Sequence, residues 1–322
     1  MKDFIELNFL NSDMKFDYKM YENCKNWGGE QEYMLKFILK QPFADIIFNF
    51  IFSDTKILLF KNCPIDIKIP QSPIDNGYLT PRYYPIARDF MLMMYKALNV
   101  IPYAYKDENN GKIFRSVVPL KNQGKMIGSY GAKIAFNFHS DNPTYKIYPE
   151  YENKSLNSPE FLSLYCMRGD KNANTDLIIL DDILGNLDNE TIQNLQKNDF
   201  IVNTPNSFDK YHEVENVSVI AKKDNKFYTR FDYHNIHAQS ENSEVALQNF
   251  KNAIEKTKQI SHNFQQGDFL IFKNQEILHS RNSFTPKFDG KDRWLIRIYG
   301  ATNMKFLNHN EIKFGEKYGI YR

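Results

Sequence analysis

Residues 267–300 read "GDFLIFKNQEILHSRNSFTPKFDGKDRWLIRIYG", and their apolar runs are typical of strands that close a β-rich core. In "RWLIRIY" (293–299) every even-numbered residue is apolar, and the odd-numbered residues include Leu295 and Tyr299 beside two arginines. Alternate residues of a strand face opposite sides of the sheet. Both faces are therefore largely apolar, which predicts a strand buried on both sides.

The two arginines of this strand, Arg293 and Arg297, need partners. An isolated charge buried in an apolar strand is very costly, so neither guanidinium is expected to stay unpaired. One interpretation is a pair of internal salt bridges to Asp or Glu. The other is binding of anionic ligands, because the planar guanidinium fits carboxylates bidentately.

Upstream, the stretch "KIAFNFHSD" (133–141) carries His139 and Asp141 two residues apart. In a strand these side chains project to the same side. The simplest reading is a hydrogen-bonded His–Asp pair at a strand end. With His279 from "EILHSR" as a third ligand, the set becomes two histidines and one carboxylate, which leaves coordination positions open on iron(II).

The remaining chain predicts many short strands decorated with helices. The strand signals begin near residue 56 and dominate after residue 101, and a hairpin is expected over 217–233 around Asp224-Asn225. Helical periodicity is found in four segments: 30–52 with a break at Pro42, 86–98, 187–200, and 243–260 with Val245, Leu247, Phe250, Ile254 and Ile260 on one face. Short strands with turns between them favour a sandwich or barrel.

Composition excludes several classes. The 322 residues are 42% hydrophobic and 15% aromatic, which is too apolar for a disordered chain. A net charge of +2 gives no global attraction to nucleic acid or membranes, and no stretch is apolar enough to span a bilayer or resembles a signal peptide. Three widely spaced cysteines, Cys24, Cys63 and Cys166, suit a reducing cytoplasm and offer neither a disulfide framework nor a zinc knuckle.

The order of these motifs resembles a known family. "HSD", a distant "HSR" and "DGKDRWLIR" are similar to the clavaminate synthase-like branch of the iron(II)/2-oxoglutarate oxygenases. These are relatives of taurine dioxygenase and include hydroxylases of free arginine, lysine and asparagine. Three further segments follow the family order, so the resemblance covers roughly residues 56–300: "LLFKNCPID" (58–66), "VVPL" (117–120) and "LSLYCMRGDKNANTDL" (162–177).

The resemblance implies a fold and a domain plan. It predicts a single α+β oxygenase domain over residues 1–322, with a distorted double-stranded β-helix, or jelly-roll, core and flanking helices. Residues 1–55 would form an N-terminal helical support, 56–300 the jelly-roll core with helical insertions, and 301–322 a C-terminal tail.

The resemblance also implies a metal centre and a cosubstrate. His139, Asp141 and His279 would bind iron(II), with 2-oxoglutarate and O2 at the positions that these residues leave open. Arg293, with Thr175 nearby, would bind the distal carboxylate of 2-oxoglutarate. Asp141 stands where many members of this branch carry Glu.

The expected reaction is hydroxylation of an unactivated C–H of a small carboxylate substrate, most simply a free or modified L-amino acid, with release of succinate and CO2. Arg297 would bind the substrate carboxylate. In "TRFDYHNIHA" (229–238), Asp232 and His234 stand where the basic amino acid hydroxylases carry two acids. One carboxylate and one imidazole bind a guanidinium group more weakly than two carboxylates do, so arginine is disfavoured as the substrate. The alternative is a structural role for Asp232, either a salt bridge with Arg230 or a hydrogen bond at a strand edge.

Three other functions stay open at this point. A desaturase, epoxidase or cyclising oxidase would use the same metal and cosubstrate. A non-catalytic jelly-roll protein would keep the metal without turnover. A metal-dependent hydrolase using His234 and His237 would leave Arg293 and Arg297 unexplained. The oligomeric state is not defined by the sequence.

Overall fold

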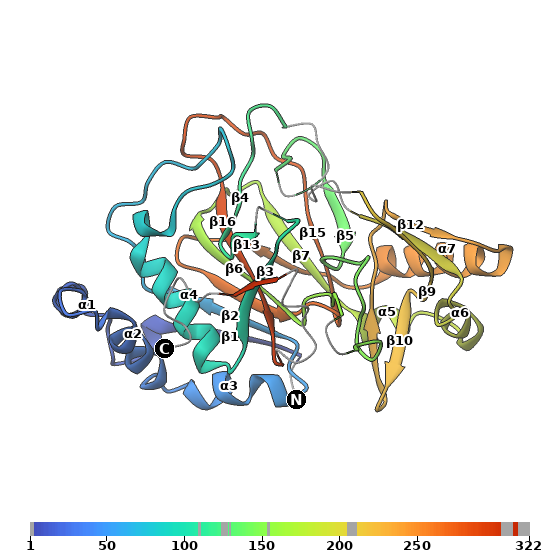
Figure 1. The fold of residues 1–322 in the computed structure, drawn as a ribbon, viewed down its shortest axis with the longest axis horizontal. Coiled ribbons are helices and arrows are strands. Elements are labelled where there is room, and N and C mark those ends of the chain that lie inside the picture. The colour runs from blue at the N-terminus through green and yellow to red at the C-terminus, as the bar shows by residue number, and fades with distance from the viewer. Residues whose placement is uncertain are drawn as a thin grey trace.

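A computed structural model describes residues 3–108, 111–123, 128, 130–152, 155–204, 211–303 and 312–314. Two β-sheets occupy the centre of the molecule, and helices cover the outer face of each (Figure 1). The predicted α+β class is confirmed.

The larger sheet has the strand order β1-β2-β14-β6-β16-β3-β17, and β4 pairs with β16. All of its pairings are antiparallel except β1 with β2. Its strands are β1 (Phe4–Asn8), β2 (Ile57–Lys61), β3 (Ile101–Tyr105), β4 (Arg115–Val117), β6 (Phe161–Arg168), β14 (Phe269–Lys273), β16 (Trp294–Ala301) and β17 (Ile312–Phe314).

The smaller sheet has the order β13-β7-β15-β5 and is antiparallel. Its strands are β5 (Phe136–His139), β7 (Asn174–Ile179), β13 (Ile260–Asn263) and β15 (Ile277–Arg281). Side chains from both sheets pack into one buried cluster, which includes Leu164 and Leu295 from the larger sheet and Leu177 and Ile277 from the smaller. The two sheets therefore face each other across a shared apolar interior.

Strand β16 is buried on both faces along its whole length, as predicted. Trp294 and Ile296 pack with the helices outside the larger sheet, whereas Leu295 and Tyr299 point into the interior between the sheets. Arg297 of this strand, and Arg293 directly before it, line a cavity in this interior. Two positively charged side chains therefore lie in the space between the sheets.

The outer face of the larger sheet is covered by the N-terminal helices. The break predicted at Pro42 falls between α2 and α3, and the apolar residues of α2, α3 and α4 join the cluster that covers β6, β14 and β16. These elements are α1 (Tyr18–Lys25), α2 (Glu30–Leu39), α3 (Ala44–Asn49), α4 (Pro85–Ala97) and the 3-10 turns η1 (Phe9–Asn11), η2 (Phe50–Phe52) and η3 (Pro81–Tyr83).

The outer face of the smaller sheet is covered by α5, α6 and α7 together with a small sheet of order β12-β8-β9. A separate hairpin, β10-β11, turns at Asp224 and Asn225, which adopt φ of 51° and 63° and confirm the predicted turn. The elements are α5 (Leu180–Leu184), α6 (Asn189–Leu195), α7 (Glu241–Lys256), β8 (Phe200–Asn203), β9 (Glu213–Val217), β10 (Ile220–Lys223), β11 (Lys226–Thr229) and β12 (Ile236–Ala238).

Several details differ from the sequence prediction. Helix α7 ends at Lys256, so Ile260 belongs to β13, and Val245 is 57% exposed although it was expected on the buried face. The N-terminal region contributes β1 to the larger sheet in addition to helices. Of the expected tail, 304–311 and 315–322 lie outside the described residues, and β17 pairs with β3.

None of the described helices has the length and apolar character needed to traverse a bilayer.

We expect Gly169→Ala to destabilise the fold where the chain leaves β6 for the smaller sheet. An added Cβ would lie 2.1 Å from the main-chain oxygen of Phe264, so backbone must shift. Overpacking of this kind costs about 1–3 kcal/mol. Urea unfolding would measure the loss. Gly29→Ala, whose added Cβ meets nothing closer than 3.6 Å, is the control and should change stability far less; equal effects would contradict the packing argument.

Candidate metal centre

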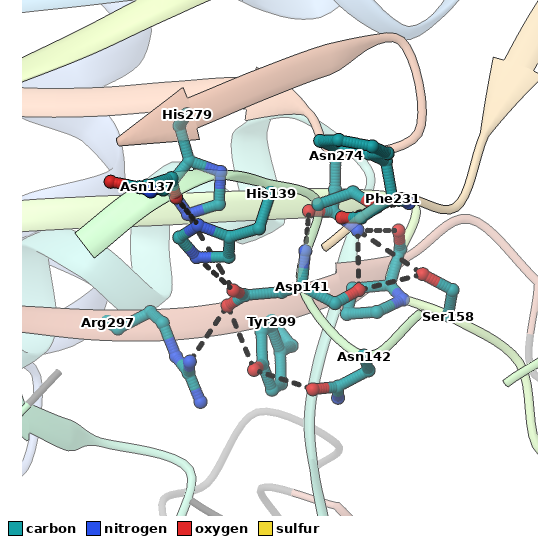
Figure 2. Close-up of polar contacts among 12 residues, drawn as sticks. Asn137, His139, Asp141, Asn142, Ser158, Phe231, Asn274, His279, Arg297 and Tyr299 are labelled. Carbon is teal, nitrogen blue, oxygen red and sulfur yellow. Dashed lines mark hydrogen bonds and ion pairs between the residues drawn. The ribbon is translucent and has the colours of Figure 1, made fainter. Parts of the chain in front are cut away.

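His139, Asp141 and His279 come together between the two sheets, as the sequence predicted. His139 and His279 are directly paired across β5 and β15, and their ring centroids are 4.2 Å apart. Asp141 lies just beyond the end of β5, and its Oδ1 is 3.3 Å from Nε2 of His139 and 3.6 Å from Nε2 of His279. Figure 2 shows the carboxylate beside both imidazoles. One ligand atom from each residue lies within 4.8 Å of the others, a spacing that a single metal ion can bridge.

The hydrogen bonding of these residues suits a metal ion. Nδ1 of His139 is 2.8 Å from the carbonyl oxygen of Asn137, so it donates its proton there, and Nε2 is the nitrogen available to a metal ion. The buried Nε2 of His139 and Nδ1 of His279 have no hydrogen-bonding partner. Two imidazoles and one carboxylate form the donor set typical of open iron(II) sites. The residues therefore fit iron(II).

The protonation states also match those of metal ligands. Burial opposes ionisation of Asp141, but the charge of Arg297 holds the pKa of its carboxyl well below the ordinary value. Burial, with the neighbouring His139, lowers the pKa of His279 to about 3. A metal ion at neutral pH would thus meet an ionised carboxylate and a neutral imidazole without displacing protons.

Asp141 belongs to a buried network of alternating charges. Its Oδ2 accepts hydrogen bonds from Arg297 Nη1 at 2.8 Å and from Tyr299 Oη at 3.0 Å. Arg297 also donates to Glu108, which pairs in turn with Arg115. The guanidinium assigned by sequence to a substrate carboxylate is therefore already engaged by two carboxylates of the chain itself.

Glu108 was not singled out from the sequence. It lies in the cluster "DENNG" (107–111), whose composition indicates only a turn. In the structure it is almost fully buried and accepts bonds from Arg115, Arg297 and Tyr299. A carboxylate in a turn gives no sequence signal of burial, so only the three-dimensional pairing identifies it.

Arg293 and Thr175 lie together as the sequence predicted. Arg293 Nη2 donates to Thr175 Oγ1 at 3.0 Å, and the guanidinium is only 3% exposed. Its Nε has no partner, and within the described ranges no carboxylate forms an ion pair with it. Burial lowers the pKa of Arg293 to about 10, which the nearby Cys166 and Asp170 offset only in part. The side chain is a buried cation that lacks an anion.

A second arginine, Arg281, adds to the positive charge of this cavity. It lies two residues after His279 and donates to the carbonyl oxygens of Ala132, Asn282 and Ile134. Burial and the charge of Arg293 lower its pKa to about 10. The same small cavity is lined by the triad, Thr175, Arg281, Arg293 and Arg297. The metal site therefore adjoins an electropositive space suited to an anion.

Asp232 and His234 lie along the edge of β5. Asp232 forms an isolated bridge with His139, and its Oδ1 accepts from the main-chain N–H groups of His234 and Asn235. Arg230 pairs with Glu150, so it forms no salt bridge with Asp232. His234 is exposed, with Nε2 3.1 Å from Asn137 Nδ2.

The hydrolase alternative had assigned a metal to His234 and His237. Within the part of the chain that the structure describes, the group His139, Asp141 and His279 is the one set of side chains close enough to hold a metal ion. His237 is exposed on β12, outside that group. This geometry gives no support to a metal site at His234 and His237.

Comparison with known proteins adds independent information. Residues 200–299 match the family described as taurine catabolism dioxygenase TauD, TfdA family. L-asparagine oxygenase of Streptomyces coelicolor is 25% identical over 252 residues, 77% of this chain and 72% of that protein. L-lysine 3-hydroxylase of Catenulispora acidiphila is 24% identical over 265 residues, 80% and 70% of the two chains. The chain is therefore similar to the TauD and clavaminate synthase-like iron(II)/2-oxoglutarate oxygenases.

Solved structures show the same fold as this chain. An asparagine oxygenase in complex with Fe(II), 3-hydroxyasparagine and succinate superposes with a TM-score of 0.75 at 21% identity, covering 92% of this chain and 93% of that one. The oxygenase OrfP in complex with Fe and alpha-ketoglutaric acid superposes with a TM-score of 0.73 at 16% identity, covering 94% and 95%. The oxygenase fold therefore extends over nearly the whole chain.

We expect Glu108→Ala to destabilise the protein strongly. The substitution removes the carboxylate that Arg115 and Arg297 share, and breaking a buried ion pair of this kind costs about 3–5 kcal/mol. The free energy of unfolding in urea is the measurement. Glu32→Ala, which removes an exposed pair with Lys36, is the control and should leave stability almost unchanged. Equal effects for the two variants would show that the Glu108 network adds no stability.

Proposed function

We propose that this chain is an iron(II)- and 2-oxoglutarate-dependent dioxygenase that hydroxylates a C–H bond of a free or modified L-amino acid. The observation that carries the proposal is the position of Arg293. This buried residue lines the same cavity as His139, Asp141 and His279, and no carboxylate of the described residues pairs with it. A metal site alone would not require a second buried cation in the same cavity. The two facing sheets are, in this proposal, a distorted double-stranded β-helix.

His139, Asp141 and His279 would hold iron(II) from one side and leave the opposite side open. When bound, iron(II) and 2-oxoglutarate supply the activation of O2, and 2-oxoglutarate leaves as succinate and CO2. The contribution of the chain is to fix these three ligands in their neutral and ionised forms within a buried site. Phe136 stacks on His139 with ring centroids 3.8 Å apart, which fixes the plane of that imidazole.

Arg293 and Thr175 would bind the distal carboxylate of 2-oxoglutarate. A carboxylate there would give Arg293 the counter-ion that it lacks, and the hydroxyl of Thr175 already orients the guanidinium. Arg281 would add a second positive charge on the wall of the same cavity. A dianion is therefore favoured over a neutral molecule of the same size.

The Arg297–Glu108 pair supports an amino acid substrate. Its guanidinium and carboxylate are the charge complement of an α-carboxylate and an α-ammonium group. A zwitterion would replace one internal ion pair by two intermolecular ones and leave no buried charge unpaired. Asp232 and His234 would then face the side chain of the substrate. Relatives that act on asparagine and lysine are consistent with this class.

A product screen tests the proposal. The purified protein would receive iron(II), ascorbate, 2-oxoglutarate and a panel of free L-amino acids, with succinate and products followed by mass spectrometry. We expect one amino acid to gain an oxygen atom with a matching amount of succinate, and His139→Ala to form neither. A product that loses two hydrogens would identify a desaturase or cyclising oxidase. Metal-dependent activity that survives His279→Ala would refute the oxygenase.

We expect Arg293→Gln to weaken 2-oxoglutarate binding by about 10- to 150-fold, because a charge-assisted hydrogen bond contributes about 1.5–3 kcal/mol. Anaerobic calorimetry with the iron(II)-loaded protein would measure the dissociation constant. Arg168→Gln removes a positive charge at the end of the neighbouring strand β6, where the guanidinium bonds to Ser72 and two carbonyls, and serves as the control. Unchanged affinity in Arg293→Gln would remove this residue from the binding site.

A further inference from the structure

Asn274 has no role in the proposed reaction, but its side chain contacts one of the candidate metal ligands. It lies in the turn between β14 and β15, it is fully buried, and its side-chain amide faces Asp141. Oδ1 of Asn274 accepts from the main-chain N–H of Asp141 at 2.9 Å, and Nδ2 lies 3.2 Å from the carbonyl oxygen of Asp141. The amide thus pairs with both main-chain polar groups of one residue, as a neighbouring strand would.

Asp141 depends on this contact because it lies outside the sheet. Strand β5 ends at His139, and Asn142 has a φ of 56°, so the chain turns away directly after the carboxylate. In the described part of the chain no hydrogen bond between main-chain groups holds Asp141. Its main chain is held by Asn274 and by Ser158 Oγ, which donates to its carbonyl oxygen at 3.0 Å.

We propose that Asn274 is a positioning residue that sets the distance between two metal ligands, Asp141 and His279. A single hairpin carries both His279, on β15, and Asn274, in the preceding turn. The hairpin therefore supplies one ligand directly and fixes the main chain of another. This inference rests on the proposed metal function of the triad.

An amide suits this place better than other side chains. A carboxylate at position 274 would lose the donor and face the carbonyl oxygens of Asp141 and Pro159, which lies 3.1 Å from Nδ2. A hydroxyl is too short to reach both groups of Asp141. An apolar side chain would leave the buried N–H of Asp141 unsatisfied, which proteins rarely tolerate.

The adjacent Gln275 is a matched control. It is also buried at 3% exposure, and its amide donates to Tyr151 Oη at 2.6 Å and to the carbonyl oxygen of Ser158 at 3.0 Å. Its Oε1 accepts from the main-chain N–H of Tyr148 at 2.8 Å. Gln275 thus anchors the same turn to the same neighbouring segment without touching Asp141.

The experiment compares Asn274→Ala with Gln275→Ala in the full chain. Metal-free proteins would be unfolded thermally, and both variants should lose similar amounts of Tm. Anaerobic titration with iron(II) should show a dissociation constant raised about 10- to 100-fold in Asn274→Ala, the range found when a residue that supports a ligand is removed. Gln275→Ala should bind iron(II) within about twofold of wild type, in contrast to that range. The visible spectrum of the cobalt(II)-loaded protein should change in Asn274→Ala only.

Each outcome has one meaning. Equal iron(II) affinity and equal cobalt(II) spectra in the two variants would overturn the role of Asn274. If wild type fails to bind iron(II), or if His279→Ala binds it as tightly as wild type, the proposed function fails instead. If Asn274→Ala does not fold, Asn274→Ser takes its place, because one short hydroxyl keeps some polarity but reaches only one group of Asp141.

Discussion

The ion pair between Asp141 and Arg297 is the contact on which the centre of this molecule depends. The 2.8 Å bond joins the end of β5, in the smaller sheet, to β16 in the middle of the larger sheet. A carboxylate buried between two sheets is tolerated only if a cation faces it. The same cation occupies one oxygen of Asp141 and leaves the other directed at His139 and His279. One ion pair therefore both stabilises the fold and determines which oxygen of Asp141 is free to bind a metal ion.

The interior charges fall into two groups with different balances. Asp141, Glu108, Arg297 and Arg115 form a group of two carboxylates and two guanidiniums that is neutral as a whole. Arg281 and Arg293 bond to neutral oxygens and form no described ion pair. A metal cation would add positive charge to this interior, so a dianion beside it would restore the balance. The electrostatics favour joint binding of the two over binding of either alone.

The sequence predicted most residues of the candidate metal centre but not the residues that hold them in place. Strand alternation placed His139 and Asp141 on one side of a strand, and the family resemblance added His279 and the pairing of Arg293 with Thr175. Glu108 and Asn274 lie in turns, where no periodicity marks a buried face, and their importance comes from partners far away in the sequence. The exposed side of α7 at Val245 was missed for a related reason, since an apolar residue at helical spacing is buried only if another element covers it.

The strand order of the larger sheet has a consequence for how the protein is made. Phe60 of β2 pairs with Phe269 of β14, and Tyr103 of β3 pairs with Tyr299 of β16, so neighbours in the sheet are distant along the chain. Contacts of such high sequence separation form slowly, because loops of great length must close first. On the ribosome, β2 and β6 emerge long before β14, which lies between them in the sheet. The nascent chain therefore exposes unpaired strand edges through most of its synthesis, and the metal centre is assembled only when the final strands arrive.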